Sequence, residues 1–101
     1  MSIDYVREKL WAAVDCLVGA EPIRQRLADA AMSLVGLTAD DLPTDELKQR
    51  YSAVMDALTK HPADYEGEGS IASSTRKLTD EEADKLGYEI YSMYIKVRGG
   101  I

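Results

Sequence analysis

Few side chains in this sequence have the types and spacing that catalysis requires. The single histidine, His61, precedes Asp64 by three residues, and a carboxylate can orient an imidazole for acid–base chemistry. The pair lies in a stretch rich in glycine, serine and proline, and no nucleophile stands at a fixed spacing from it. We expect His61 to be a solvated loop residue. The alternative is a small enzyme whose site forms between subunits from His61, Tyr65 and carboxylates.

The sequence also contains few residues that could support metal or redox chemistry. Cys16 is the only cysteine, so neither an internal disulfide nor a zinc site is expected, and a reducing, cytoplasmic setting is favoured. We expect Cys16 to be a small buried apolar residue. The acids at 80–84 lack the alternating ligands and the glycine of a calcium loop, and the run Gly67-Glu68-Gly69-Ser70 has no Lys-Ser/Thr pair after it and is no phosphate cradle. We expect no metal and no cofactor.

The charge of the chain restricts its partners. The formal net charge is −6, and the excess of acids is spread along the chain instead of forming one block. A nucleic-acid-binding protein would carry a basic stripe, and a membrane span needs about 20 consecutive apolar residues; the sequence has neither. We expect no direct contact with nucleic acid or membrane, and we interpret the acidity as an aid to solubility.

Apolar residues recur every three or four positions, which predicts helices. The pattern places them at about 3–18, 22–37, 44–60 and 80–97, with a short helical turn before the third. The last has the clearest start, because Thr79 and Glu82 match a capping box. With 101 residues the chain is predicted to be one domain. The expected fold is all-α, a small antiparallel bundle of about four helices.

The stretch from His61 to Lys77 shows no periodicity. Its only large apolar residues are Tyr65 and Ile71, and it is long for a connection within a compact domain. We expect a mobile loop at about 61–77 before the last helix. Tyr65, Arg76 and Lys77 are its candidate contact residues, in case it becomes ordered on a partner; the alternative is a connection with no binding role.

The last predicted helix is apolar around more of its circumference than one core stripe requires. Besides the stripe, it carries Tyr88, Tyr91, Tyr94 and Ile95. Either this is the central helix of the bundle, or these residues form an interface, since tyrosine is enriched at interface cores.

The sequence therefore favours a non-enzymatic interaction or regulatory module. It would act through a helical surface, as a homodimer or as a subunit of a larger assembly. The alternative function is an acidic inhibitor, of the kind found in phages, that imitates nucleic acid.

Overall fold

The computed structural model describes residues 3–99, and the regular secondary structure of that part of the chain is all helical, without a strand. The elements in chain order are α1 (Ile3–Leu17), α2 (Ile23–Leu34), the 3₁₀ turn η1 (Ala39–Asp41), α3 (Asp45–Leu58), α4 (Ser70–Arg76) and α5 (Asp80–Val97). The predicted all-α class is confirmed. The helix count differs from the expected four, because α4 forms within the segment predicted to be a loop. No helix within residues 3–99 is long and apolar enough to cross a membrane.

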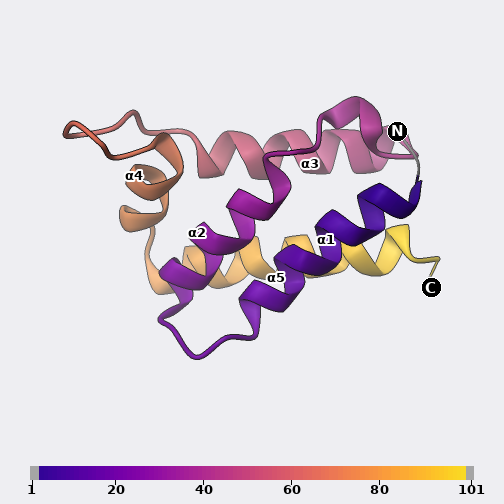
Figure 1. Ribbon diagram of the computed structural model, residues 1–101, viewed down its shortest axis with the longest axis horizontal. Coiled ribbons are helices and arrows are strands. Elements are labelled where there is room, and N and C mark those ends of the chain that lie inside the picture. Colours follow the sequence, from indigo (N-terminus) through magenta and orange to yellow (C-terminus); the bar gives the residue numbers. More distant parts are fainter. Residues whose placement is uncertain (1–2, 100–101) are drawn as a thin grey trace.

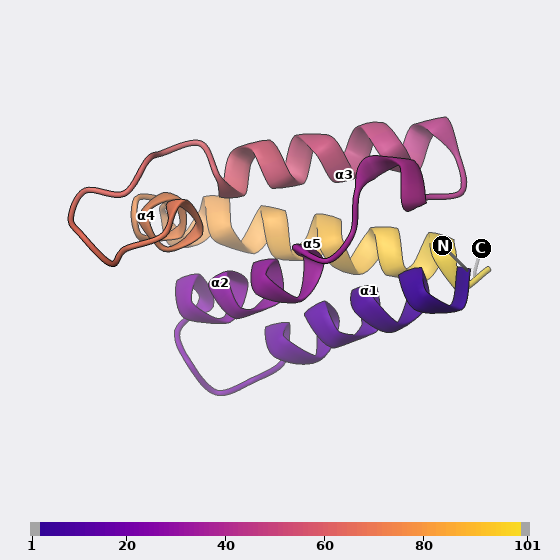
Figure 2. The ribbon, with the colours of Figure 1, turned by 45° about the horizontal axis from the view of Figure 1, so that its top comes forward.

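The longest helix, α5, runs the length of the molecule and organises the others (Figure 1). Figure 2 shows α3 along one side of α5, and α1 and α2 along the other. On the α3 side, Arg50 donates to the carboxylate of Glu89 at 2.5 Å and to the hydroxyl of Ser92 at 2.9 Å. The hydrogen bond and charge of Glu89 raise the pKa of Arg50. This side of α5 is therefore bound to α3 by polar contacts.

The core between the helices is built from the predicted apolar stripes. Its largest members are almost fully buried: Val6 and Leu10 of α1, Leu27 and Leu34 of α2, Leu58 of α3, and Ile90 and Met93 of α5. Helices of this length are marginal in isolation, so the burial of these stripes supplies most of their stability. The stripes therefore determine which face of each helix stays at the surface, where it can contact other molecules.

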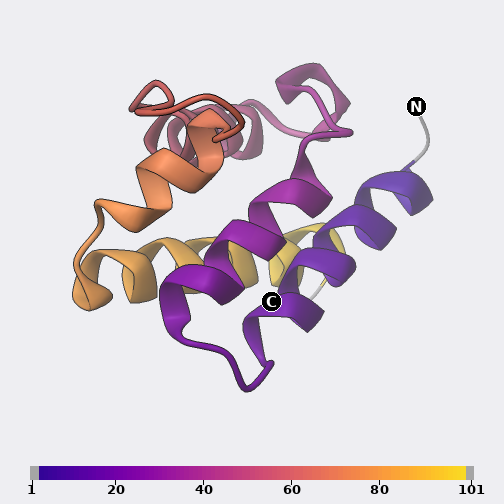
Figure 3. The same cartoon turned by 60° about the vertical axis from the view of Figure 1, so that its left-hand side comes forward.

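Helix α4 corrects the expectation of a loop throughout 61–77. It stands between the end of α3 and the start of α5 (Figure 3) and contacts α2. Its buried residues are the small polar ones Ser73, Ser74 and Thr75. The Ser74 hydroxyl accepts a hydrogen bond from the His61 amide at 2.8 Å, and the Thr75 hydroxyl donates to the carbonyl of Ile71 at 2.9 Å. Because this face is polar, hydrophobic periodicity does not reveal the helix.

The preceding connection is held by an ion-pair cluster, the loop clasp, made of Asp64, Glu68, Arg76 and Lys77. Arg76 binds Asp64 at 2.6 Å and Glu68 at 3.1 Å, and Lys77 binds Asp64 at 2.8 Å. The Glu68 carboxylate also accepts a hydrogen bond from the Asp64 amide at 2.9 Å. Gly67, with φ of +91°, provides the left-handed turn that brings Glu68 back toward the start of the loop.

The predicted start of α5 is reproduced, whereas α2 and α3 end earlier than expected, at Leu34 and Leu58. At α5, the Thr79 hydroxyl accepts from the Glu82 amide at 3.0 Å and the Glu82 carboxylate accepts from the Thr79 amide at 2.8 Å, which is the predicted capping box. These hydrogen bonds lower the pKa of Glu82. The α5 start is thereby fixed next to the loop clasp.

Candidate functional site

The four residues predicted as an interface on α5 are only partly covered by the fold. Tyr88 is 70% exposed and Tyr91 is 45% exposed, and their rings lie with centroids 6.1 Å apart. Tyr94 and Ile95 are half-buried. The structure thus brings all four onto one region of α5, and the two central tyrosines remain accessible.

Helix α1 contributes to the same region two apolar side chains that the sequence analysis did not select. Trp11 is 53% exposed and Val18 is 75% exposed. The Trp11 ring lies 5.8 Å from the Tyr94 ring, centroid to centroid. A usable signal was present, because Trp11 and Val18 are seven residues apart and both lie off the core stripe of their segment. Their side chains therefore share one face of the helical segment and its C-terminal extension.

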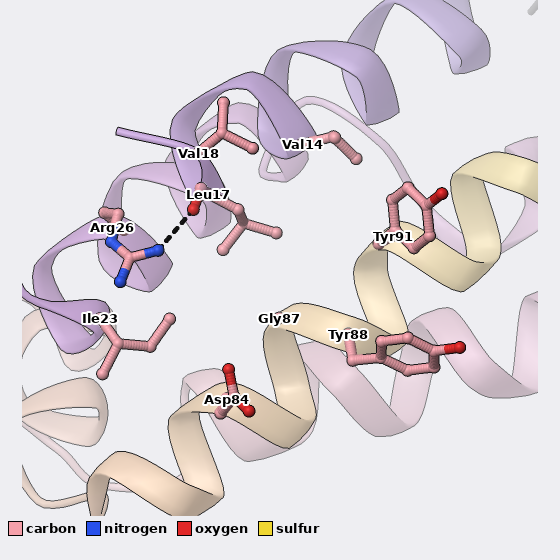
Figure 4. Close-up of a pocket in the computed structure, with 9 residues that line it drawn as sticks. All are labelled: Val14, Leu17, Val18, Ile23, Arg26, Asp84, Gly87, Tyr88 and Tyr91. Carbon is pink, nitrogen blue, oxygen red and sulfur yellow. Dashed lines mark hydrogen bonds between the residues drawn. The ribbon is translucent and has the colours of Figure 1, made fainter. Parts of the chain in front are cut away.

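Together these side chains form what we call the aromatic surface: Trp11, Val18, Tyr88, Tyr91 and Tyr94. Between its two helices lies a shallow groove of about 220 Å³, the α1–α5 groove, lined by Val14, Leu17, Val18, Ile23, Arg26, Asp84, Gly87, Tyr88 and Tyr91. Figure 4 shows side chains of α1 extending toward α5, and the two tyrosine rings on the α5 side. The walls are mainly apolar, with one acid and one base at one end.

Gly87 and Arg26 explain how the groove is built. Gly87 is buried where α1 meets α5, and a Cβ atom placed on it would lie 3.3 Å from Cδ2 of Leu17. The absence of a side chain therefore permits this close approach of the two helices. The Arg26 guanidinium donates to the carbonyl of Leu17 at 2.6 Å and to that of Glu21 at 2.7 Å. It satisfies a carbonyl at the end of α1 that has no helical partner.

The structure does not assemble His61 and Asp64 into an acid–base pair. Their proximity in sequence suggested one, but Asp64 instead binds Arg76 and Lys77 in the loop clasp. No ion pair joins Asp64 to His61 in the described part of the chain. Hydrogen bonds from Lys77 and Arg76 lower the pKa of the Asp64 carboxyl group, which stabilises its ionised form and makes it a poor base.

The three candidate contact residues of the loop have different surroundings. Tyr65 is 63% exposed and available to a partner. Arg76 and Lys77 are engaged in the loop clasp, where the hydrogen bonds that Arg76 donates to Glu68 and Asp64 raise the pKa of Arg76. A partner that binds these two bases would have to compete with their internal carboxylates.

The residues considered for thiol and metal chemistry are not assembled into a site in the described part of the chain. Cys16 packs against the core and is half-buried, where full burial was expected, with its sulfur 4.0 Å from the hydroxyl of Ser33. Among residues 3–99, no cluster of histidine, cysteine, aspartate and glutamate could hold a metal ion. The acids predicted to cap α5 are used that way at Glu82.

Comparisons with models of known protein families, with characterised protein sequences and with solved structures give no match to this chain. The surface chemistry of the chain itself is therefore the guide to its function.

Proposed function

We propose that this protein is a non-enzymatic interaction module that binds another polypeptide through the aromatic surface of α1 and α5. The observation that supports this most directly is the adjacency of Tyr88 and Tyr91 on α5 to Val18, directly after α1, around one groove, with all three side chains 45% exposed or more. Scattered apolar residues are normal on a protein surface, whereas a contiguous group indicates a binding site.

The side chains of this surface suit recognition of a protein. Tyrosine and tryptophan are enriched at the centres of interfaces and dominate their energetics. Each offers a large apolar area and loses little side-chain entropy on binding. Burial of two tyrosine rings would contribute roughly 2–4 kcal/mol before the cost of association. Such a surface supports a reversible complex.

The pairing of several carboxylates with arginines favours a binding function over a catalytic one. The carboxylates of Asp64 and Glu68 are occupied by Arg76, and that of Glu89 by Arg50. A catalytic acid or base needs access to its substrate and a pKa near the working pH. These groups are instead used to hold the loop and α3 in place.

Other ion pairs on the surface give no specific support to the alternative of an acidic inhibitor that imitates nucleic acid. Such a mimic needs an uninterrupted row of carboxylates facing its target. Here Glu46 pairs with Arg50 and Lys96, and Asp80 pairs with Arg24. The acids are thus interleaved with bases along the surface, and the alternative remains the weaker proposal.

Site-specific photocrosslinking in the native cells tests the interaction proposal. A benzophenone amino acid at position 88 should give a covalent adduct to a protein, since Tyr88 lies in the proposed surface. The matched control is position 52 on α3, where Ser52 is exposed outside the groove. We expect the position 88 adduct to disappear when Tyr91→Lys is added. Equal adducts at both positions, or none at position 88, would refute the proposal.

A further inference from the structure

The occupant of the aromatic surface can be inferred from the order of side chains along α5. Five residues form what we call the outer stripe: Asp84, Tyr88, Tyr91, Ile95 and Arg98. They are spaced by four, three, four and three positions, which places them along one side of a helix. This alternation is also the spacing of residues at the contact between two paired helices. The outer stripe thus has the geometry of an unpaired helix contact.

The two ends of the outer stripe are symmetric in position and opposite in charge about Tyr91. Asp84 lies seven residues before Tyr91, and Arg98 lies seven residues after it. If a second α5 packs antiparallel across a two-fold axis at Tyr91, each Asp84 faces Arg98 of the second copy. Tyr88, three residues before Tyr91, then faces Tyr94, three residues after it. A parallel pair would instead place like charges together, which is unfavourable.

The two charged ends of the stripe are available for such pairing. Asp84 and Arg98 are exposed, and neither forms an ion pair with any residue in the range 3–99. The Arg98 guanidinium lies over the ring of Tyr94, 5.9 Å from its centroid, so it is already held on the side of the aromatic surface. Exposed ion pairs add little affinity, but they determine orientation and register.

We propose that the occupant is a second copy of this chain, bound through antiparallel α5 helices with Tyr91 at the two-fold axis. This inference rests on the interaction function proposed above and specifies its partner. A two-fold contact uses the same patch on both copies, so it requires self-complementary charge, which the outer stripe has. Trp11 and Val18 flank the stripe and enlarge the contact. The apolar centre is small, so the dimer should be weak and concentration-dependent.

Sedimentation equilibrium of the purified full chain over the micromolar range tests this arrangement, with a charge swap at the two ends of the stripe. Asp84→Arg and Arg98→Asp should each raise the dimer dissociation constant by about tenfold, since each brings like charges together. The double variant should return it to within about threefold of the original value. Lys48→Asp on α3, outside the groove, is the matched control and should leave association unchanged. Far-UV circular dichroism confirms that each variant is folded.

The results separate the two proposals. Two results together support antiparallel pairing. Tyr91→Lys disrupts the dimer, and the double charge variant regains the affinity that each single charge variant loses. A dimer without restoration, or a monomer throughout the concentration range, overturns it. If the photocrosslink at position 88 then joins a different protein, the interaction function stands and only self-pairing fails. If no crosslink forms there, both proposals fail.

Discussion

The hydroxyl of Tyr51 on α3 donates to the carbonyl oxygen of Leu34, 2.9 Å away at the end of α2. The carbonyl oxygen of Leu37 lies 2.8 Å from the same hydroxyl, so one proton serves two acceptors. The Tyr51 side chain is buried, and the Leu34 carbonyl also accepts a hydrogen bond from the Leu37 amide at 3.0 Å. This one phenol group therefore ties the exit of α2 to the middle of α3.

Replacement of Tyr51 by phenylalanine should lower the free energy of unfolding by about 1–2 kcal/mol. The ring keeps its packing, while two buried carbonyl groups lose a hydrogen-bond donor. Urea denaturation at neutral pH measures the change. Tyr65→Phe removes a hydroxyl from an exposed ring and should leave the midpoint unaltered, so equal losses in the two variants would contradict this role for Tyr51.

The same residue should make the fold sensitive to alkaline pH. Burial, with a smaller effect from the charge of Asp41, raises the pKa of Tyr51 above its usual value of about 10. The unfolded chain therefore loses this proton at lower pH than the folded chain does. Its contribution to stability is complete below about pH 10 and is lost as the pH rises through the raised folded value. Unfolding titrations across this range should show the loss in the natural chain and a smaller one in Tyr51→Phe.

Disruption of the loop clasp should affect the connection before α4 locally and leave the core intact. The Asp64 amide donates to the Glu68 carboxylate, which Arg76 holds in place. Arg76→Ala should therefore speed hydrogen exchange at the Asp64 amide while the global unfolding midpoint changes little. Lys48→Ala, which removes a base that lies on α3 outside the clasp, serves as the control. Unchanged exchange at Asp64 in the Arg76 variant would show that the clasp does not order the loop.

Acid should open the loop clasp in the natural chain. Hydrogen bonds from Lys77 and Arg76 lower the pKa of Asp64, and hydrogen bonds from the Asp64 amide and Arg76 lower that of Glu68. The stabilising effect of such groups is present above their unfolded values of about 4 and is lost as the pH falls through their lower folded values. Carboxyl chemical shifts from NMR, recorded through the acid range, should show each of the two groups titrating below the usual value for its residue type.

The start of α5 should depend on its capping box. Thr79→Ala removes the oxygen that accepts from the Glu82 amide, and loss of such a cap costs about 1 kcal/mol. Thr79→Ser keeps the oxygen and should retain most of the stability. Thermal or urea unfolding of the two variants gives the comparison, and equal stabilities of the alanine and serine variants would argue against the cap.

The sequence predicts α1, α2, α3 and α5 because each buries a stripe of large apolar residues. Their observed bounds lie within a few residues of those expected. Helix α4 is the exception. It buries the hydroxyl-bearing residues Ser73, Ser74 and Thr75, and its position depends on the His61 amide and the loop clasp. Such contacts join distant parts of the chain, and residue periodicity carries no information about them.

The candidate site could be predicted in part. The surplus of apolar residues on the last helix identified Tyr88 and Tyr91, which depend only on the helical period. Trp11 and Val18 join them through the way α1 lies across α5, with Gly87 against Leu17. That arrangement is a property of helix packing, and a single stripe of residues does not specify it.

The position of Trp11 also allows binding to be followed by tryptophan fluorescence. It is the only tryptophan in the chain, it is half-exposed, and it borders the region where a partner is proposed to bind. The tryptophan emission of the unmodified protein, excited at wavelengths that tyrosine does not absorb, therefore comes from one place. Occupancy of the surface should shift that emission toward shorter wavelength, so that binding can be followed without attaching a dye.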